Sequence, residues 1–361
     1  MRLLTLIFSA VLLVAMGPAN AEAGAPPADL GLVYAITETA EGAWRTSIYL
    51  RGAGPGPARL LYRDTGEKDQ ILTKIAGSDL VGSAHTVPPR DIYVMMGEAT
   101  AADLTTCADA LCRLRIADKA EEQDEPEPLL VIPLCFSDAS PYGLRNRAPI
   151  FAVSADGERI ALQALRAGDV RFTRPAIRVL ASGGREEWRI ALEEQDLYVA
   201  DLAWSPDGKS LAYLVMPQGD VHTLDEALLP RAGLYLADLE ARTTRLVYRC
   251  YGRALAWGPR PDLITVAARA RDIWDEVYLA QVVVRSGKKV EEFSLPPRAV
   301  ALSYSDDGRW LAVQSAQGDR QQIWLYPSPE GWGRLFHQVP QQEGRMSLLG
   351  WVRSSGPGTE P

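Results

Sequence analysis

Three segments of the chain share nearly the same pattern of residues. Residues 151–164 read FAVSADGERIALQA, residues 202–215 read LAWSPDGKSLAYLV, and residues 302–315 read LSYSDDGRWLAVQS. In each segment a short apolar run leads into an Asp-Gly pair, and a second apolar run follows. This order predicts a β-hairpin, because Asp-Gly suits a tight turn between two strands. The pattern recurs about every 50 residues, which is typical of the blades of a β-propeller.

The central repeat predicts a blade of four antiparallel strands. Its strands are expected at Leu202–Ser205, Ser210–Val215, Leu234–Asp238 and Arg245–Tyr248. The same order of strands can be laid along most of the chain. Complete units are expected over residues 149–192, 253–295 and 299–339, a degenerate unit over residues 83–134, and a unit without its first strand over residues 31–62.

The two ends of the chain complement each other. The unit at the N-terminus begins with its second strand, Gly31–Ile36, and the chain closes with a single strand, Met346–Trp351. Pairing of these strands would complete the unit and remove an exposed strand edge. The expected fold is therefore an all-β propeller of six blades, closed by pairing of the C-terminal strand with the N-terminal blade. Seven blades are the alternative, if residues 83–134 contain two units.

The Asp-Gly pairs are predicted to be structural. An Asp carboxylate can accept a hydrogen bond from the backbone two residues further on, and Gly adopts positive φ without steric cost. We therefore assign a turn-forming role, rather than catalysis, to the following residues: Asp156, Gly157, Asp207, Gly208, Asp307 and Gly308.

The N-terminal residues predict export of the protein. Residues 1–21 combine Arg2, an apolar run and the small residues Ala19 and Ala21 of a cleavage site, which is the pattern of a signal peptide. Residues 22–30 are interpreted as a lead-in, residues 31–353 as a single propeller domain, and residues 354–361 as a disordered tail. The expected location is the periplasm or the extracellular space, with no membrane span in the mature chain.

Charge and cysteine content narrow the possible partners. The net charge is −8, and no basic stripe of the kind that binds nucleic acid is visible. Four cysteines in an oxidising compartment favour disulfides. Cys107 and Cys112 bracket the short stretch CADALC and are the expected pair, whereas the pairing of Cys135 and Cys250 is left open. The spacing lacks a CxxC motif, so neither a metal site nor a cofactor is predicted.

The repeats resemble those of TolB-like, WD-repeat-like propellers of exported bacterial proteins. Trp204-Ser205-Pro206-Asp207-Gly208 fits the repeat of that family closely, and the stretches at residues 154–157 and 305–308 fit it well. The additional N-terminal α/β domain of TolB itself has no counterpart in this sequence. The resemblance implies a six-bladed fold and an exported location, and a partner-binding role by analogy.

Any binding site is expected on the connections between second and third strands. These connections vary in length and carry aromatic residues and arginines, which are enriched at protein interfaces. The candidate binding residues are Trp44, Arg171, Phe172, Arg174, His222, Trp274 and Asp275. We expect a monomeric, non-catalytic scaffold that recognises a protein or peptide.

Two other functions stay open. A lactonase-like or lyase-like enzyme, acting on a small molecule or depending on a metal, would need acidic side chains that converge at the mouth of the central channel. Glycan binding would use Trp44 and Trp274 as stacking platforms. A prolyl-oligopeptidase-type hydrolase is excluded, because the chain has no Gly-x-Ser-x-Gly motif.

Overall fold

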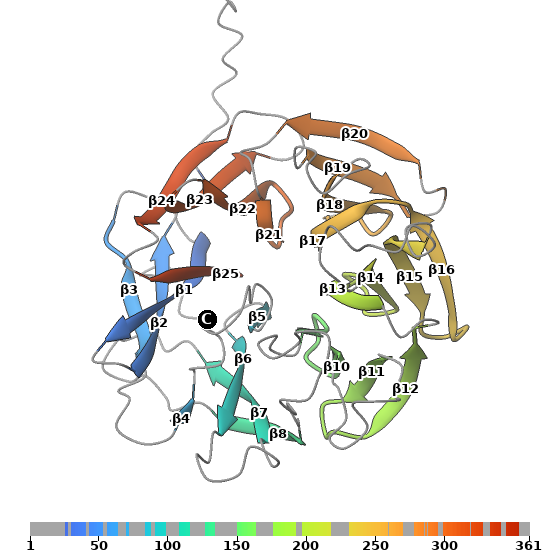
Figure 1. Cartoon of the computed structure of the whole chain (residues 1–361), viewed down its shortest axis with the longest axis horizontal. Coiled ribbons are helices and arrows are strands. Elements are labelled where there is room, and N and C mark those ends of the chain that lie inside the picture. The colour runs from blue at the N-terminus through green and yellow to red at the C-terminus, as the bar shows by residue number, and fades with distance from the viewer. Residues whose placement is uncertain are drawn as a thin grey trace, which may run out of the picture.

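The computed structural model shows β-sheets arranged around a central axis, which is the architecture of a β-propeller (Figure 1). The structure describes residues 26–27, 30–40, 43–52, 56–63, 70–71, 84–87, 91–98, 108–115, 127–133, 150–163, 176–192, 197–217, 231–258, 260–269, 278–284, 286, 288–294, 299–317, 319–327, 333–340 and 344–353. The predicted signal peptide (1–21) and tail (354–361) lie outside them. Within these ranges, no helix has the length and apolar character needed to cross a membrane.

Five of the sheets are regular blades of four antiparallel strands. The terminal blade consists of β25 (Arg345–Arg353), β1 (Leu30–Ala40), β2 (Ala43–Gly52) and β3 (Arg59–Arg63). The next two regular blades consist of β9 (Ile150–Val153), β10 (Arg159–Gln163), β11 (Ala176–Ala181) and β12 (Glu186–Ala191), and of β13 (Leu197–Trp204), β14 (Ser210–Pro217), β15 (Gly233–Asp238) and β16 (Thr243–Tyr248). The last two consist of β17 (Tyr251–Trp257), β18 (Leu263–Arg269), β19 (Tyr278–Val283) and β20 (Lys289–Ser294), and of β21 (Ala299–Tyr304), β22 (Trp310–Gln317), β23 (Arg320–Pro327) and β24 (Arg334–Pro340).

The remaining sheet differs from the expected unit. It has five strands: β4 (Gln70–Ile71), β5 (Ala84–Val87), β6 (Asp91–Glu98), β7 (Ala108–Arg115) and β8 (Glu127–Pro133). Because β7 pairs along the whole of β6, both β4 and β5 occupy the other edge of β6. The structure therefore shows five regular blades rather than the six predicted, and in the unit predicted to be degenerate two short segments share the first-strand position. A two-residue strand such as β4 has no readable period in the sequence.

The Asp-Gly hairpins have a common turn geometry. In the β9–β10 turn, the Ser154 hydroxyl donates to Asp156 Oδ1 (2.5 Å), and the Glu158 N–H donates to the same oxygen (3.0 Å). The Ser154 hydroxyl in turn accepts from the Arg159 N–H. The same contacts recur in the turns around Asp207 and Asp307. Gly157, Gly208 and Gly308 lie at φ 73°, 66° and 66°, where other residues are strained.

The apolar core lies in the seams between neighbouring blades. The seam between the β9–β12 and β13–β16 blades buries Val179 and Ile190 against Trp204 and Leu211. Similar clusters fill the seams that follow along the chain. Each blade therefore buries both faces, and this explains why the second strands are apolar at nearly every position.

Tryptophans at the ends of the first strands add directional bonds across the seams. Trp204 donates its indole N–H to the carbonyl of Ala152 in the preceding blade (3.0 Å), and Trp351 donates to the carbonyl of Ser303 (3.0 Å). Ala152 and Ser303 occupy equivalent positions in the repeat. Trp257 breaks the pattern, because its N–H bonds to Pro261 within its own turn (3.1 Å).

The two ends of the described chain lie in one sheet. β25 pairs antiparallel with β1 in a register that sets Trp351 opposite Leu32 and Met346 opposite Ile36, so the pairing predicted for these segments is present. The first strands also contact one another around the axis, in the order β25, β5, β9, β13, β17, β21 and back to β25 (Figure 1).

Two glutamines of the β21–β24 blade also bind β25. The Gln314 amide donates to the carbonyl of Met346 (2.6 Å) and accepts from the Leu348 N–H (2.7 Å). The Gln321 amide bonds in the same two-way manner to the Gly344 carbonyl (2.7 Å) and the Met346 N–H (2.8 Å). These side chains replace the backbone ladder that β25 lacks on its second edge.

A one-residue bulge interrupts the outermost strand of every described sheet. The extra residues are Leu61, Leu129, Glu187, Val247, Val290 and Phe336. Bulges twist an edge strand and hinder its pairing with another chain. The rim of the ring is thereby protected against edge-to-edge association.

Removal of β25 should destroy the cooperative fold. A chain that ends at Gly344 loses the partner strand of β1 and the bonds that Gln314 and Gln321 form with Met346 and Leu348, so we expect aggregation or the loss of a sharp thermal transition. A chain that ends at Arg353 lacks only residues outside the described ranges and is the matched control, whose Tm should match that of the full chain. Equal Tm values for the two truncated chains, by circular dichroism, would contradict this role of β25.

Candidate functional site

The strand order defines two faces of the ring. On the turn face, first strands connect to second strands and third strands to fourth. On the loop face, second strands connect to third strands. The loop-face connections are long in four consecutive sheets, where they span residues 99–107, 164–175, 218–232 and 270–277. In the terminal and β21–β24 blades only two residues separate the second strand from the third, at positions 41–42 and 318–319. The loop face is therefore asymmetric.

Most of the predicted binding residues belong to three of these connections, those of the β9–β12, β13–β16 and β17–β20 blades. Arg171, Phe172 and Arg174 follow β10, His222 follows β14, and Trp274 and Asp275 follow β18. All six lie outside the described residues, so their side chains stay a prediction. The strands that carry them belong to adjacent blades and end on the same face.

Trp44 was predicted to be in a loop but lies in a strand. Trp44 is the second residue of β2 and pairs with Thr39, because the β1–β2 connection is a two-residue turn rather than a loop. Cys112 lies within β7 and pairs with Val94. Cys107 is outside the described residues, so the predicted disulfide stays a prediction. Cys250 is a buried free thiol, and burial raises its pKa to about 12.

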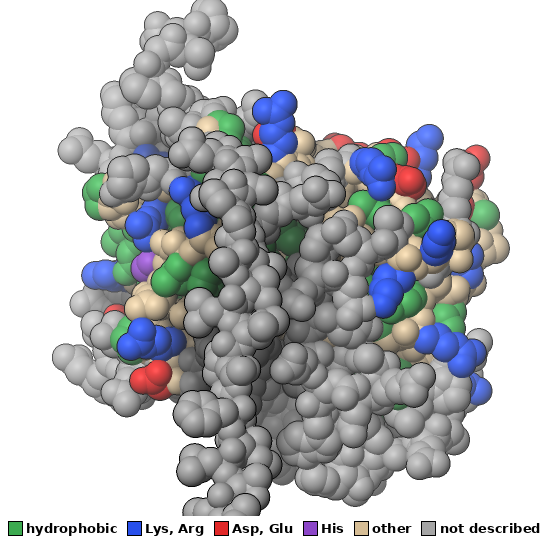
Figure 2. Space-filling model, turned by 90° about the horizontal axis from the view of Figure 1, so that it is seen from above, with side chains coloured by type: hydrophobic (Ala, Val, Ile, Leu, Met, Phe, Trp, Pro, Cys, Tyr) green, Lys and Arg blue, Asp and Glu red, His purple; other side chains and the backbone are tan. Residues whose placement is uncertain are grey.

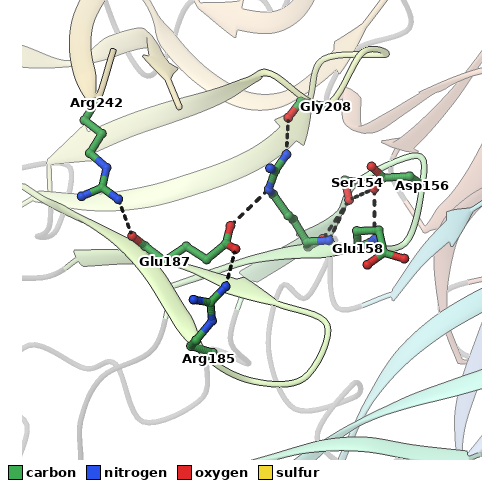
Figure 3. Close-up of polar contacts among 8 residues, drawn as sticks. Ser154, Asp156, Glu158, Arg185, Glu187, Gly208 and Arg242 are labelled. Atoms are coloured by element: carbon green, nitrogen blue, oxygen red, sulfur yellow. Dashed lines mark hydrogen bonds and ion pairs between the residues drawn. The ribbon is translucent and has the colours of Figure 1, made fainter. Parts of the chain in front are cut away.

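Several polar side chains of the turn face are engaged in bonds within the protein. The seven residues labelled in Figure 3 come from neighbouring turns and strands of two blades, and dashed lines link them through polar contacts. The Glu187 carboxylate, at the β12 bulge, pairs with Arg159 (3.2 Å) and with Arg185 (3.4 Å). Arg159 also donates to the Gly208 carbonyl of the next blade (3.3 Å), and Arg242 donates to the Glu187 carbonyl (3.4 Å).

Hydrogen bonds within the turns also favour the ionised form of Asp156 and Asp207. The Ser154 hydroxyl bond is the main cause that lowers the pKa of Asp156, and the Ser205 hydroxyl does the same for Asp207.

On the side shown in Figure 2, described basic side chains are distributed over the outside of the ring among apolar and neutral ones. Within the described ranges, no group of three or more His, Cys, Asp or Glu side chains is placed to hold a metal ion.

Asp201 is an acidic residue on the inner wall of the ring. It follows the bulge of β13, where Val199 and Asp201 pair with successive residues of β14. One carboxyl oxygen accepts from its neighbour Leu202 N–H (2.9 Å), and the other accepts from the Leu255 N–H of β17 in the next blade (2.7 Å). The carboxyl group therefore bridges two first strands.

The environment of Asp201 shifts its titration. Part of the residue is accessible to solvent, but protein atoms surround the carboxyl group, and this burial is the largest effect and raises its pKa to about 7. The two backbone N–H bonds oppose the shift and lower the pKa. A buried carboxyl with a neutral-range pKa in a first strand is a feature that sequence reasoning missed.

A signal for Asp201 was present in the repeats. When Trp204 is aligned with Val153, Trp257, Tyr304 and Trp351, the position of Asp201 is occupied in the other regular blades by apolar residues: Ile150, Ala254, Ala301 and Leu348. A single acid in an otherwise apolar column indicates a local role that the repeat itself does not require.

Comparison with known proteins supports the fold and gives no family. No protein-family model matches the chain, and no curated protein matches it. A chain from the crystal structure of a nidogen/laminin complex has a TM-score of 0.54 at 9% identity, over 89% of this chain and 99% of that one. This likeness supports a β-propeller.

Two further solved structures are similar at lower scores. A protein assigned to TolB from Agrobacterium tumefaciens has a TM-score of 0.48 at 14% identity, over 86% of this chain and 89% of that one. A protein assigned as a 6-phosphogluconolactonase from Bacteroides uniformis has a TM-score of 0.49 at 13% identity, over 88% and 84% of the two chains. Membership of the TolB-like family therefore stays a prediction.

Replacement of Asp201 by Asn should change how stability depends on pH. The raised pKa means that the folded chain binds more protons than the unfolded chain between pH about 4 and pH about 7. The free energy of unfolding should therefore fall as pH rises through this window, by at most about 1.4 kcal/mol per pH unit, and level off above it.

Urea unfolding between pH 4 and 8 measures this slope. Asp201→Asn should remove it, and Asp319→Asn, whose side chain is 78% exposed, should keep it. The same slope in both variants would contradict the assignment to Asp201.

Proposed function

We propose that this chain is an exported, non-catalytic binding scaffold that recognises a protein or peptide partner. The partner binds on the loop face, over the three consecutive blades formed by β9–β12, β13–β16 and β17–β20. The observation that carries the proposal is the asymmetry of that face, where long connections cluster over these blades and tight turns occupy the terminal and β21–β24 blades.

The residue types in the long connections suit recognition of a partner. Arg171, Phe172 and Trp274 are of the kinds that dominate binding energy at protein interfaces. Binding residues are commonly found on loops that a rigid scaffold positions. Trp44 leaves the proposed site, because β2 places it in the terminal blade next to a two-residue turn.

The turn face is a poorer candidate for the same role. Its turns are short, and several of its polar side chains bond within the ring, as in the Glu187 cluster and the Ser-Asp pairs. An interface there would have to break these contacts. The similar chain described with laminin and nidogen comes from a protein–protein complex, which is consistent with a propeller that binds protein.

The remaining expectations belong to the same proposal. The scaffold acts as a monomer without a cofactor, in the periplasm or outside the cell, and residues 1–21 direct its export. The β4–β8 sheet serves as a sixth blade, since β5 contacts both β25 and β9 in the ring.

Substitution of the loop face should abolish partner binding without unfolding the protein. The loop variant combines Arg171→Ala, His222→Ala and Trp274→Ala, one residue from the long connection of each of these three blades. The turn variant combines Glu158→Ala, Arg185→Ala and Lys209→Ala, all on the turn face. Pull-down from envelope extract identifies the partner, and titration of the purified partner then gives the affinity of each variant.

We expect the loop variant to bind at least about 30-fold more weakly, the effect of losing one interface anchor of about 2 kcal/mol. The turn variant should bind as the parent chain does. Equal binding by the loop variant and the parent would overturn the loop-face site. Recovery of a glycan, or stoichiometric metal in the purified protein, would instead support the glycan-binding or enzymatic alternative.

A further inference from the structure

A histidine and an arginine meet in the seam that closes the ring, between the terminal blade and the β21–β24 blade. Arg51, near the end of β2, extends to β24, where its Nη1 donates to the Phe336 carbonyl (2.9 Å) and lies 3.3 Å from His337 Nδ1. The Arg51 guanidinium also stacks on the Phe336 ring at 4.8 Å. Arg51 therefore links the two blades that meet where the ring closes.

The contact with Arg51 requires a neutral His337. An arginine side chain only donates hydrogen bonds, so His337 Nδ1 accepts and the neutral ring carries its proton on Nε2. Nε2 is buried and has no hydrogen-bond partner in the described structure. A second proton would sit on Nδ1 and point at the N–H group of Arg51. Neither N–H of the charged ring would then have an acceptor among the described residues.

The terminal blade offers this ring no compensating charge. Among the described side chains of that blade, Arg51 of β2 and Tyr34 of β1 contact His337, and the Tyr34 ring lies 4.7 Å from the imidazole. Tyr49 of β2 stacks on Tyr34 at 5.6 Å. Burial raises the pKa of Tyr34, so its phenol stays neutral over the range in which a histidine titrates. A protonated His337 would therefore contact no negative charge on β1 or β2.

The β21–β24 blade and β25 offer none either. β23 places Ile323 opposite His337, and β25 adds the apolar Met346 to the seam. The charged residue of β24 is Arg334, whose guanidinium lies 5.7 Å from the Trp310 ring. The described charges of these strands are therefore positive, like that of Arg51.

The effect of pH on this seam has a definite sign. Burial of the ring and, secondarily, the charge of Arg51 lower the pKa of His337 below its usual value. The folded chain then binds fewer protons at His337 than the unfolded chain does, so stability is lost as the pH falls below about 6.5. Asp201 acts in the opposite direction, because its pKa is raised. The two effects are therefore separated by comparing variants rather than by the pH dependence of the whole chain.

We propose that His337 is an acid-sensitive latch of the seam that closes the ring. When its ring gains a second proton, the contact with Arg51 breaks, and the terminal blade loosens from the β21–β24 blade. Protonation is reversible, so a return to neutral pH closes the seam again. The latch lies outside the three blades assigned to partner binding, so it stands or fails independently of the proposed loop-face function.

Nuclear magnetic resonance of the histidine side chains tests the protonation step. The chain contains 3 histidines, and a His337→Phe variant assigns the signals of His337. At pH 7.5 its nitrogen shifts should report a neutral ring protonated on Nε2, and its pKa should lie below 6.5. Arg51→Gln removes the charge but keeps an amide that can donate to Nδ1, so it should raise the pKa of His337. Arg185→Gln, at an 80% exposed side chain, is the control and should leave it unchanged.

Hydrogen–deuterium exchange at pH 7.5 and pH 5.0 tests the loosening of the seam. Exchange is expressed as protection relative to the intrinsic rate at each pH, because the chemical step itself depends on pH. In the parent chain, β2 and β24 should lose protection at least about tenfold at pH 5.0, the effect of losing one hydrogen bond to a charged group. β14 should lose less, because Asp201 strengthens its seam in acid. In His337→Phe the loss in β2 and β24 should be less than about twofold, with circular dichroism verifying the fold.

Three results would overturn the latch. They are a pKa of His337 at or above 6.5 in the parent chain, an unchanged pKa in Arg51→Gln, or an equal loss of protection in the parent chain and in His337→Phe.

Discussion

The pairing of β25 with β1 is the interaction on which the rest of the structure depends. A blade can bury both faces only if it has a neighbour on each side. The terminal blade is built from strands of both ends of the chain, and residues of β25 and β1 together form its seam with the β21–β24 blade. Gln314 and Gln321 reinforce this strand from the blade that precedes it. The loop-face connections are positioned by blades that this pairing holds in place.

The seams between blades combine a repeated apolar core with individual polar contacts. The indole bonds of Trp204 and Trp351 follow the repeat, because equivalent residues bond to equivalent carbonyls. Asp201 and Glu187 depart from it, each placing an acid where other blades have apolar residues. The Asp201 carboxyl accepts from the Leu255 N–H of the next blade, whereas the Glu187 carboxylate pairs within its own blade with Arg159, which in turn donates to the Gly208 carbonyl of the next blade. Such departures mark where one seam differs from the others.

The sequence predicts the local features well and the long-range ones unevenly. The Ser-x-Asp-Gly turns are predictable because all of their bonds fall within a few residues, and the β25–β1 pairing is predictable because Leu349-Gly350-Trp351 repeats the first-strand pattern. The strand position of Trp44 was missed, since nothing in the residues around it separates a two-residue turn from a longer loop. β4 has too few residues for a pattern. The side chains of Arg51 and His337 contact each other although the residues are 286 positions apart, and no local pattern in the sequence predicts this contact.

Hydrogen–deuterium exchange of the intact chain tests the central claim most directly. The amides of β25, at residues 345–353, should exchange as slowly as those of β1 and β14, because all three strands are released only when the propeller unfolds. Rapid exchange of residues 345–353 while β14 stays protected would contradict the account, since β25 would then not be held in the terminal blade.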